Sequence, residues 1–160
     1  MPDNPQVIMD SLRRIVQALR QSSAQSERSA GLSGAQALVL KHVAARDGLS
    51  INDLAGLTFT HQSSVSDVVS RLEARGLLQR QRDPDDARRC LLLLLPAGRV
   101  ALAGISGATA QEKLMLALGD LPAPLVADLA RGLAALVTAA SLGEGPPVMF
   151  FESQPERPAT

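Results

Sequence analysis

The sequence predicts a mainly α-helical protein that carries one small β-hairpin. Apolar residues recur every three or four positions in several stretches, which is the spacing of an amphipathic helix. One pair of short apolar runs brackets a segment rich in proline and aspartate, as the two strands of a hairpin would. With 160 residues, of which 46% are hydrophobic, the chain is long enough to bury a core as one ordinary domain.

The N-terminal stretch predicts a helix that needs a partner. Asn4 and Pro5 suit a helix start, and apolar residues then follow at near-heptad spacing, namely Ile8, Leu12, Ile15 and Leu19. The partner is either a second subunit or the core of the same chain. The serine-rich stretch from Gln21 to Gly31 predicts a frayed helix end or a linker.

Two capping boxes predict the next two helices. Ser33 and Gln36 open the first helix, which stops at Asp47-Gly48. Ser50 and Asp53 open the second, which is short. A tight connection then leads into a third helix.

The third helix, predicted at about residues 61–75, has two contrasting faces. One is an apolar stripe that can lie on a core, made of Val65, Val68, Val69 and Leu72. The opposite face carries mostly short hydroxyl side chains, namely Ser63, Ser64, Ser66, Asp67, Ser70 and Arg71. Short polar side chains can approach a surface closely and form hydrogen bonds, which suits a DNA major groove. With the short helix before it, this stretch predicts a helix-turn-helix whose recognition helix ends at Arg75-Gly76.

The hairpin follows at about residues 77–95 and is expected to form a wing. Its strands are the runs Leu77–Arg82 and Cys90–Leu95, and its tip is the charged segment Asp83–Arg89. After it, Pro96 begins a helix that is expected to run to about Leu118. A turn at residues 119–122 leads to a last helix that ends near residue 143 and has one apolar face, made of Leu125, Leu129, Leu133 and Leu136.

Six short segments stand in one order between Leu32 and Arg99. They are Leu32-Ser33-x-x-Gln36, Leu49-Ser50-Ile51-x-x-Leu54-Ala55, Ser64-Val65-Ser66, Arg71-Leu72-Glu73-Ala74-Arg75-Gly76-Leu77, Asp86-x-Arg88-Arg89 and Pro96-Ala97-Gly98-Arg99. Together they resemble the multiple-antibiotic-resistance regulator (MarR) family of winged-helix repressors.

The resemblance implies a winged helix-turn-helix domain flanked by dimerisation helices. The expected parts are an N-terminal dimerisation helix and linker at 1–31, a DNA-binding region at 32–98, C-terminal dimerisation helices at 99–143 and a proline-rich tail at 144–160. The implied function is that of a homodimeric, sequence-specific transcriptional regulator, a repressor that a small lipophilic or phenolic ligand releases from a near-palindromic operator. A two-fold dimer places two recognition helices about one DNA turn, ~34 Å, apart.

The tail is rich in proline and yet contains an apolar cluster, Val148 to Phe151. Pure disorder rarely keeps such a cluster. We expect it to pack on the dimer body or on the partner subunit.

The resemblance also implies which residues contact double-stranded DNA. In the family pattern Asp-x-Arg the aspartate orients an arginine that enters the minor groove, and Asp86 and Arg88 match this pattern. Arg80, Arg82 and Arg89 are either phosphate contacts or exposed charges, whereas the glutamine and serines of the recognition helix are candidates for base edges or phosphates. The predicted DNA-binding set is Gln62, Ser63, Ser64, Ser66, Ser70, Arg71, Arg82, Asp86, Arg88 and Arg89.

Two positions depart from the family pattern. Asp67 stands where many members have a basic residue, so it either accepts a hydrogen bond from cytosine or lowers the affinity for DNA. Leu95 stands where a threonine usually caps the next helix, and leucine has no side-chain acceptor for the orphan backbone N–H groups. The junction after the wing is therefore expected to be unusual.

Charge and composition bound the function. The formal net charge is zero and the pI is about 6.7, so that a positive surface must come from the placement of individual arginines. This balance keeps one alternative open, a winged-helix protein-interaction module that has lost DNA binding. No nucleophile, base and orienting group stand in a recognisable arrangement, so we expect neither an enzyme nor catalytic residues.

The chain offers little to a metal or cofactor, and none is expected. A single cysteine excludes an internal disulfide, and two scattered histidines are too few for a zinc site. We expect Cys90 to be a small packed residue rather than a redox-active thiol, and His42 to lie on a helix surface rather than in a ligand crevice. The longest apolar run, Leu91–Leu95, is far shorter than the ~20 residues of a membrane span, and no signal peptide is recognised, so we expect a cytoplasmic protein.

Overall fold

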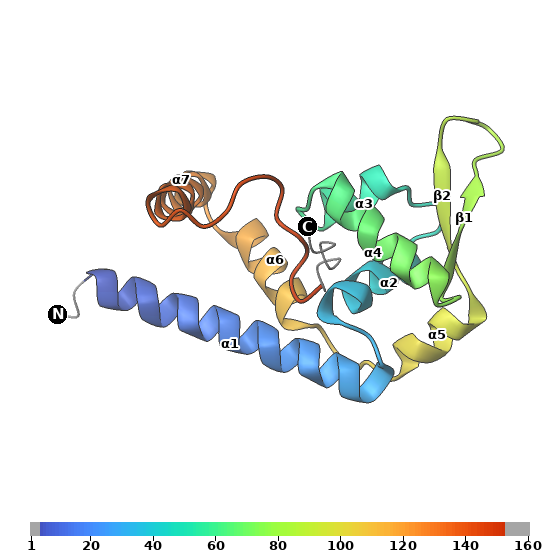
Figure 1. Cartoon of the computed structure of the whole chain (residues 1–160), viewed down its shortest axis with the longest axis horizontal. Helices are drawn as coiled ribbons and strands as arrows, with labels where there is room; N and C mark the ends of the chain where they lie inside the picture. Colours follow the sequence, from blue (N-terminus) through green and yellow to red (C-terminus); the bar gives the residue numbers. More distant parts are fainter. Residues whose placement is uncertain (1–3, 153–160) are drawn as a thin grey trace, which may run out of the picture.

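The computed structural model describes residues 4–152 and consists of helices with one two-stranded antiparallel sheet. The elements in chain order are α1 (Asn4–Ala30), α2 (Gly34–Ala45), α3 (Ile51–Leu57), α4 (Gln62–Ala74), β1 (Leu78–Arg82), β2 (Cys90–Leu94), α5 (Pro96–Ala103), α6 (Ala110–Asp120) and α7 (Ala123–Ala139). Figure 1 shows that α2, α3, α4 and the hairpin gather at one end of the molecule, whereas α1, α6 and α7 extend away from them. We call the first group, residues 32–94, the winged-helix body.

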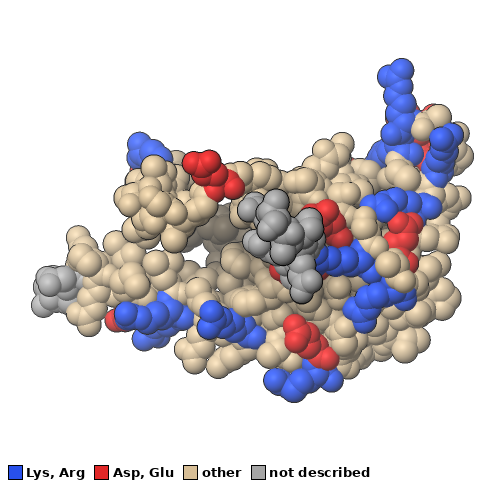
Figure 2. Space-filling model, in the orientation of Figure 1, with Lys and Arg blue, Asp and Glu red and all other residues tan. Residues whose placement is uncertain are grey.

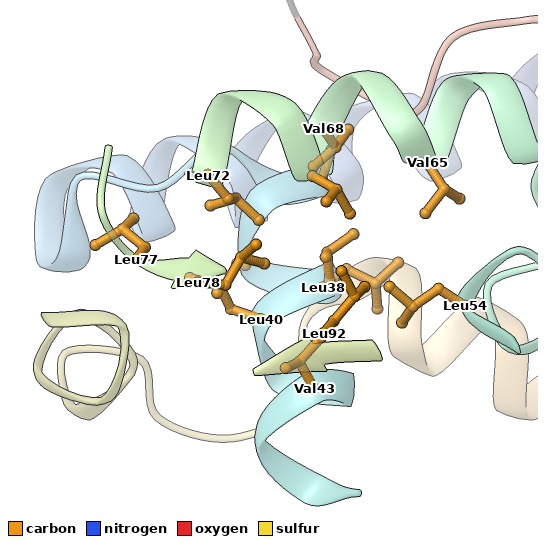
Figure 3. Packing of buried hydrophobic residues seen from close by; sticks show 14 of the residues in the cluster. Leu38, Leu40, Val43, Leu54, Val65, Val68, Leu72, Leu77, Leu78 and Leu92 are labelled. Atoms are coloured by element: carbon orange, nitrogen blue, oxygen red, sulfur yellow. The ribbon is translucent and has the colours of Figure 1, made fainter. Parts of the chain in front are cut away.

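The core of the winged-helix body lies between α2 and the apolar face of α4. Residues 35–40 of α2 are all buried, because α1, α4, α5 and β2 contact this helix. The predicted stripe of α4 is fully buried against it: Val65, Val68, Val69 and Leu72 have no exposed surface. Leu54 of α3 and Leu92 of β2 complete the cluster seen in Figure 3.

Both predicted capping boxes are present and set where α2 and α3 begin. The Ser33 hydroxyl accepts from the Gln36 N–H at 3.2 Å, and the Gln36 side chain accepts from the Ser33 N–H at 3.3 Å. Ser50 and Asp53 exchange the same two hydrogen bonds at the start of α3. These local bonds fix the angle at which each helix enters the body.

The hairpin is the predicted wing. β1 and β2 pair in antiparallel register from Leu78 opposite Leu94 to Arg82 opposite Cys90. The Leu92 N–H donates to the Leu49 carbonyl at 2.8 Å, so the base of the wing is also tied to the segment before α3. A Cβ at Gly98 would lie 2.2 Å from the Leu77 carbonyl oxygen, so α5 passes the residue before β1 at a distance that only glycine allows.

The expectation that the N-terminal helix frays after Gln21 is wrong, because α1 continues unbroken to Ala30. Tertiary hydrogen bonds hold the serine-rich part: the Ser23 hydroxyl accepts from the Gly34 N–H at 3.0 Å, and the Ser22 hydroxyl accepts from the Ala110 N–H at 3.0 Å. Serine costs some helix stability. Here, however, its small side chain lets α2 and α6 approach closely, and its hydroxyl accepts a hydrogen bond from them.

The predicted single helix from Pro96 to about Leu118 is also wrong, since it is two helices. α5 ends at Ala103, and a Cβ at Gly104 would lie 2.3 Å from the Ser29 carbonyl oxygen. Gly107 adopts a left-handed φ of 72°, and Thr109 then opens α6 through a capping box with Glu112. Leu95 precedes α5 as an N-cap without a side-chain hydrogen bond, as expected from its chemistry.

The tail returns to the winged-helix body of its own chain, whereas packing on the dimer body or on the partner subunit stays a prediction. Met149 is 3% exposed and belongs to the core cluster. The Ser64 hydroxyl donates to the Pro147 carbonyl at 2.8 Å. Residues 153–160 of the predicted tail, like residues 1–3 of the predicted N-terminal part, lie outside the described residues.

Candidate nucleic-acid interface

The outer face of α4 is a polar strip. Gln62, Ser63, Asp67 and Ser70 are exposed, and Ser66 is half-buried. The strip lies opposite the buried valines and Leu72, because α4 is packed on the core along one side only. We call these five residues the α4 strip.

The turn that leads into α4 is tight and carries one unusual backbone conformation. The Thr58 hydroxyl donates to the Leu54 carbonyl at 2.7 Å and closes the end of α3. Phe59 follows with a left-handed φ of 51°, although it is not glycine. His61 then stands at the N-cap of α4 without a side-chain capping bond.

The first strand of the wing is fastened to α4. The Arg80 guanidinium donates to the Glu73 carboxylate at 2.5 Å and to the Ser70 hydroxyl at 3.1 Å, and the Arg80 N–H donates to Glu73 at 3.1 Å. Ser70 also donates to the Ser66 carbonyl at 2.9 Å. Arg80 thus links the wing to α4, and Ser70 is one of the groups on α4 that binds it.

The tip of the wing is ordered by its aspartates. The Asp83 carboxylate accepts from the Asp85 N–H at 2.9 Å, and the Asp86 carboxylate accepts from the Arg88 N–H at 3.0 Å. Asp86 therefore fixes the backbone from which the exposed Arg88 side chain projects. Arg82 is likewise exposed at the outer end of β1.

The second strand of the wing is fastened to α3 through Arg89. Its guanidinium pairs with the Asp53 carboxylate at 2.7 Å. Hydrogen bonds from the Ser50 backbone and hydroxyl, and then from Arg89, outweigh burial and hold the pKa of the Asp53 carboxyl below its usual value. The same carboxylate therefore caps α3 and positions the wing.

A groove of about 490 Å³ runs between the start of α3, the start of α4 and the wing. It brings together four members of the predicted set, Gln62, Asp86, Arg88 and Arg89. Asn52 also lines it and is exposed, but it is not in the predicted set. The sequence signal for Asn52 was an uncharged polar residue in the first turn of the helix before the recognition helix.

The remaining members of the predicted set divide into two groups. Ser63, Ser66 and Ser70 lie on the α4 strip and Arg82 on the wing, whereas Ser64 and Arg71 face the tail. Ser64 is buried, and Arg71 pairs with Glu152. Figure 2 shows basic and acidic side chains next to one another over this end of the molecule, with basic side chains reaching out along the wing.

A second, apolar cleft of about 580 Å³ lies behind the helix-turn-helix. Its walls come from α1, α6, α7, the turn before α4 and the tail, and they include Ile15, Phe59, Leu114, Leu118, Leu133 and Phe150. Among residues 4–152, His61 is the one titratable residue that lines it. The cleft can therefore accept an apolar molecule but offers it few polar partners.

Two single-residue expectations are wrong. Cys90 is exposed rather than packed, because it faces outward at the end of β2, whose buried residue is Leu92. His42 is half-buried rather than on the surface, and its Nε2 is buried without a hydrogen-bond partner among the described residues. Burial lowers the pKa of His42.

Two absences hold for the described residues 4–152. These residues contain no group of three or more His, Cys, Asp or Glu side chains arranged to hold a metal ion. None of their helices combines the length and the hydropathy that crossing a membrane requires.

Comparison with known proteins places this arrangement in a family. A model described as MarR family matches residues 30–89. A curated protein from Thauera aromatica, "Putative transcriptional regulatory protein for hcr operon", is 38% identical over 74 residues. That match covers 46% of this chain and 45% of the relative, so the chain spans less than half the length of this relative.

Solved structures extend the likeness to most of the chain. A probable transcriptional regulator from Pseudomonas aeruginosa is 33% identical, with a TM-score of 0.53, over 81% of this chain and 96% of that one. The transcriptional regulator BldR from Sulfolobus solfataricus is 25% identical, with a TM-score of 0.54, over 86% of this chain and 96% of that one. The family match, these likenesses and the winged-helix body show that the chain belongs to the MarR family of winged-helix transcriptional regulators.

Proposed function

We propose that the protein is a homodimeric, sequence-specific DNA-binding repressor, released from a near-palindromic operator by a small lipophilic or phenolic ligand. The observation that carries the proposal is the α4 strip beside a wing whose tip projects Arg88. Because MarR proteins are transcriptional regulators, no enzymatic role is proposed.

The polar strip and the wing suit two different grooves of DNA. Serine and glutamine side chains on the strip can reach base edges or phosphates in a major groove. An arginine on a rigid wing tip can enter the adjacent minor groove, where the negative potential is strongest when the groove is narrow. Asp86 supports this role of Arg88 by fixing its backbone.

The homodimer is supported by apolar surface that the chain leaves uncovered. One face of α7 exposes Leu125, Leu136 and Val137, and α1 exposes Val7, Ile8 and Val16, all outside the apolar cleft. Large contiguous apolar faces on a protein in water are usually covered by a partner. A second copy of the chain would cover them and place the two recognition helices on one side of a DNA duplex.

The ligand response is supported by the apolar cleft. Its walls come both from the turn before α4 and from α6 and α7, so an occupant would touch the DNA-binding and the dimerising parts at once. A molecule that binds better when these parts are apart or rotated would shift the conformational equilibrium toward that arrangement. We therefore propose the cleft as the effector site.

One observation favours a second candidate, a winged-helix protein-interaction module. Asp67 is exposed on the α4 strip and has no ion pair among residues 4–152, so the strip presents a negative charge where DNA would approach. A basic protein surface would be the corresponding partner. The same experiment tests both candidates.

Selection of bound duplexes from a random DNA pool, followed by salt titration of the best binder, tests the proposal. We expect an inverted repeat with half-site centres about 10 base pairs apart, and affinity that falls with salt concentration. Arg88→Ala should weaken binding about tenfold and reduce the salt slope by about one. Arg131→Ala removes the same charge from the exposed surface of α7 and should leave both quantities unchanged. No enriched sequence and no binding even at low salt would instead favour the interaction module.

A further inference from the structure

The segment that follows α7 docks on the winged-helix body at three points, two of them on the recognition helix. Pro147 accepts a hydrogen bond from Ser64, Met149 is buried in the core cluster, and the Glu152 carboxylate pairs with Arg71. Figure 1 shows the segment running from the end of α7 to the start of α2 beside α4. We call Pro147–Glu152 the tail latch.

The Glu152 anchor is well enclosed. Its side chain is 6% exposed, and its second carboxylate oxygen accepts from the Ser33 hydroxyl at 3.2 Å, at the N-terminus of α2. A buried carboxylate is stable only with such partners. Arg71, which is 30% exposed, supplies the compensating charge.

The tail latch borders the α4 strip on the side opposite the wing. Ser64 and Arg71 are seven residues apart and so lie on one side of the helix, next to Asp67. Glu73 and Ser70, which bind Arg80 of the wing, lie on the other side. A DNA groove that received the strip would therefore have the wing on one flank and the latch on the other.

The latch also removes the only cation of α4 from use. Within Gln62–Ala74 the charged residues are Asp67, Arg71 and Glu73. Glu73 is paired with Arg80 and Arg71 with Glu152, so the strip retains only the negative charge of Asp67. DNA affinity depends on cations that neutralise phosphates, and the docked latch leaves α4 with none available.

We propose that the tail latch is an autoinhibitory contact in which Glu152 competes with a DNA phosphate for Arg71. This inference rests on the proposed DNA-binding function and adds a regulatory contact to it. A guanidinium binds a carboxylate and a phosphate through the same fork of N–H donors, so the two contacts exclude each other. Undocking of the latch frees Arg71 to reach the DNA backbone, and DNA binding in turn favours the undocked latch.

The test is a double-mutant cycle in the full-length chain on the selected duplex. Glu152→Gln keeps the shape of the side chain and removes the charge that holds Arg71. Glu144→Gln is the matched control, because it removes the same charge from an exposed position of the same tail. We expect Glu152→Gln to bind DNA about three- to tenfold more tightly than Glu144→Gln, with a salt slope steeper by about one. In an Arg71→Ala background the two glutamate variants should bind equally.

A second variant tests the latch through its apolar anchor. Met149→Ala weakens docking without changing any charge, and a thermal melt shows whether the body stays folded. If Met149→Ala stays folded, this variant should also bind DNA more tightly than the wild type. Equal affinities of Glu152→Gln and Glu144→Gln, or a difference that persists in Arg71→Ala, would overturn the latch while leaving the regulator intact. Loss of all DNA binding in the wild type and in every variant would overturn the proposed function and the latch together.

Discussion

Leucine side chains are buried in the winged-helix body and exposed on helix α7. Leu38, Leu54 and Leu72 of the body have no exposed surface, whereas Leu125 and Leu136 of α7 are 50% and 42% exposed. Both regions show apolar positions at helical spacing, so the sequence pattern alone does not tell them apart. Periodicity shows that a helix has an apolar face to bury. Only the fold shows whether the same chain buries it.

The contrast also separates what one chain can do from what requires two. The core of the body is formed mainly by α2, α3, α4 and the wing and is completed by Met149 of the same chain, so its geometry is set within a single chain. The outer helices gain little burial from their own chain, and their stability as a unit is expected to depend on a second copy. The following changes test this division.

The largest effect is expected from a charge on the exposed face of α7. Leu136→Glu would place a carboxylate in each half of the proposed two-fold interface, where it would be buried without a partner. We expect the dimer to dissociate into monomers, as measured by sedimentation equilibrium. Ala134→Glu adds the same charge on the opposite side of the helix and should leave the dimer intact. Identical behaviour of the two variants would place the dimer interface elsewhere.

A matched pair of valines sharpens the comparison within one chain. Val68 of α4 is fully buried, and Val100 of α5 is 75% exposed. Val68→Ala should lower the free energy of unfolding by about 1.5–3 kcal/mol through lost burial and a small cavity. Val100→Ala should change it by less than about 0.5 kcal/mol. Urea unfolding monitored by circular dichroism measures both, and similar losses would contradict the assignment of the core.

Glu112 tests the link between the two regions, because it binds Lys41 of α2 at 2.6 Å from its place in α6. Burial opposes its ionisation, but hydrogen bonds from Lys41 and Thr109 prevail and hold the pKa of Glu112 below its usual value of 4.5. Its contribution to stability is therefore complete above pH 4.5 and is lost as the pH falls through the lowered pKa. Glu112→Gln should cost about 1 kcal/mol at pH 7. In thermal melts across pH, the difference in stability between Glu112→Gln and the wild type should narrow below pH 4.5. A difference that widened there would contradict the lowered pKa of Glu112.

The smallest effect is expected at Phe59, an exposed apolar residue within the body. It is a large apolar residue that is 69% exposed, and its left-handed φ of 51° strains a side chain with a Cβ. Phe59→Gly relieves the strain but raises the entropy of the unfolded chain. We expect a net gain of about 0.5 kcal/mol in the free energy of unfolding. A loss of stability in urea titration would show that Phe59 is held by contacts across the cleft.

Local signals predicted the body well. The boxes at Ser33 and Ser50 and the stripe of α4 act within a few residues, so they are readable from the sequence and recur in the structure. The break between α5 and α6 had a local signal too, the capping box of Thr109 and Glu112, although the prediction of one helix did not take it into account.

Long-range contacts account for what was missed. The serine-rich end of α1 is helical because α2 and α6 bind its hydroxyls, and no pattern within that stretch reports this. The exposed members of the α4 strip followed from helix geometry. Ser64 and Arg71 belong to the same outward arc by sequence, and only the return of the tail distinguishes them.

The burial of Met149 has a consequence for how a newly made chain reaches its fold. The helices and hairpin of the winged-helix body are contiguous in sequence, so their contacts close short loops and can form early in synthesis. The seat of Met149 is filled only by a residue that is translated well after β2, at a higher cost in loop-closure entropy. A nascent body therefore emerges with an apolar gap beside its recognition helix. That gap closes when the segment that includes Met149 arrives.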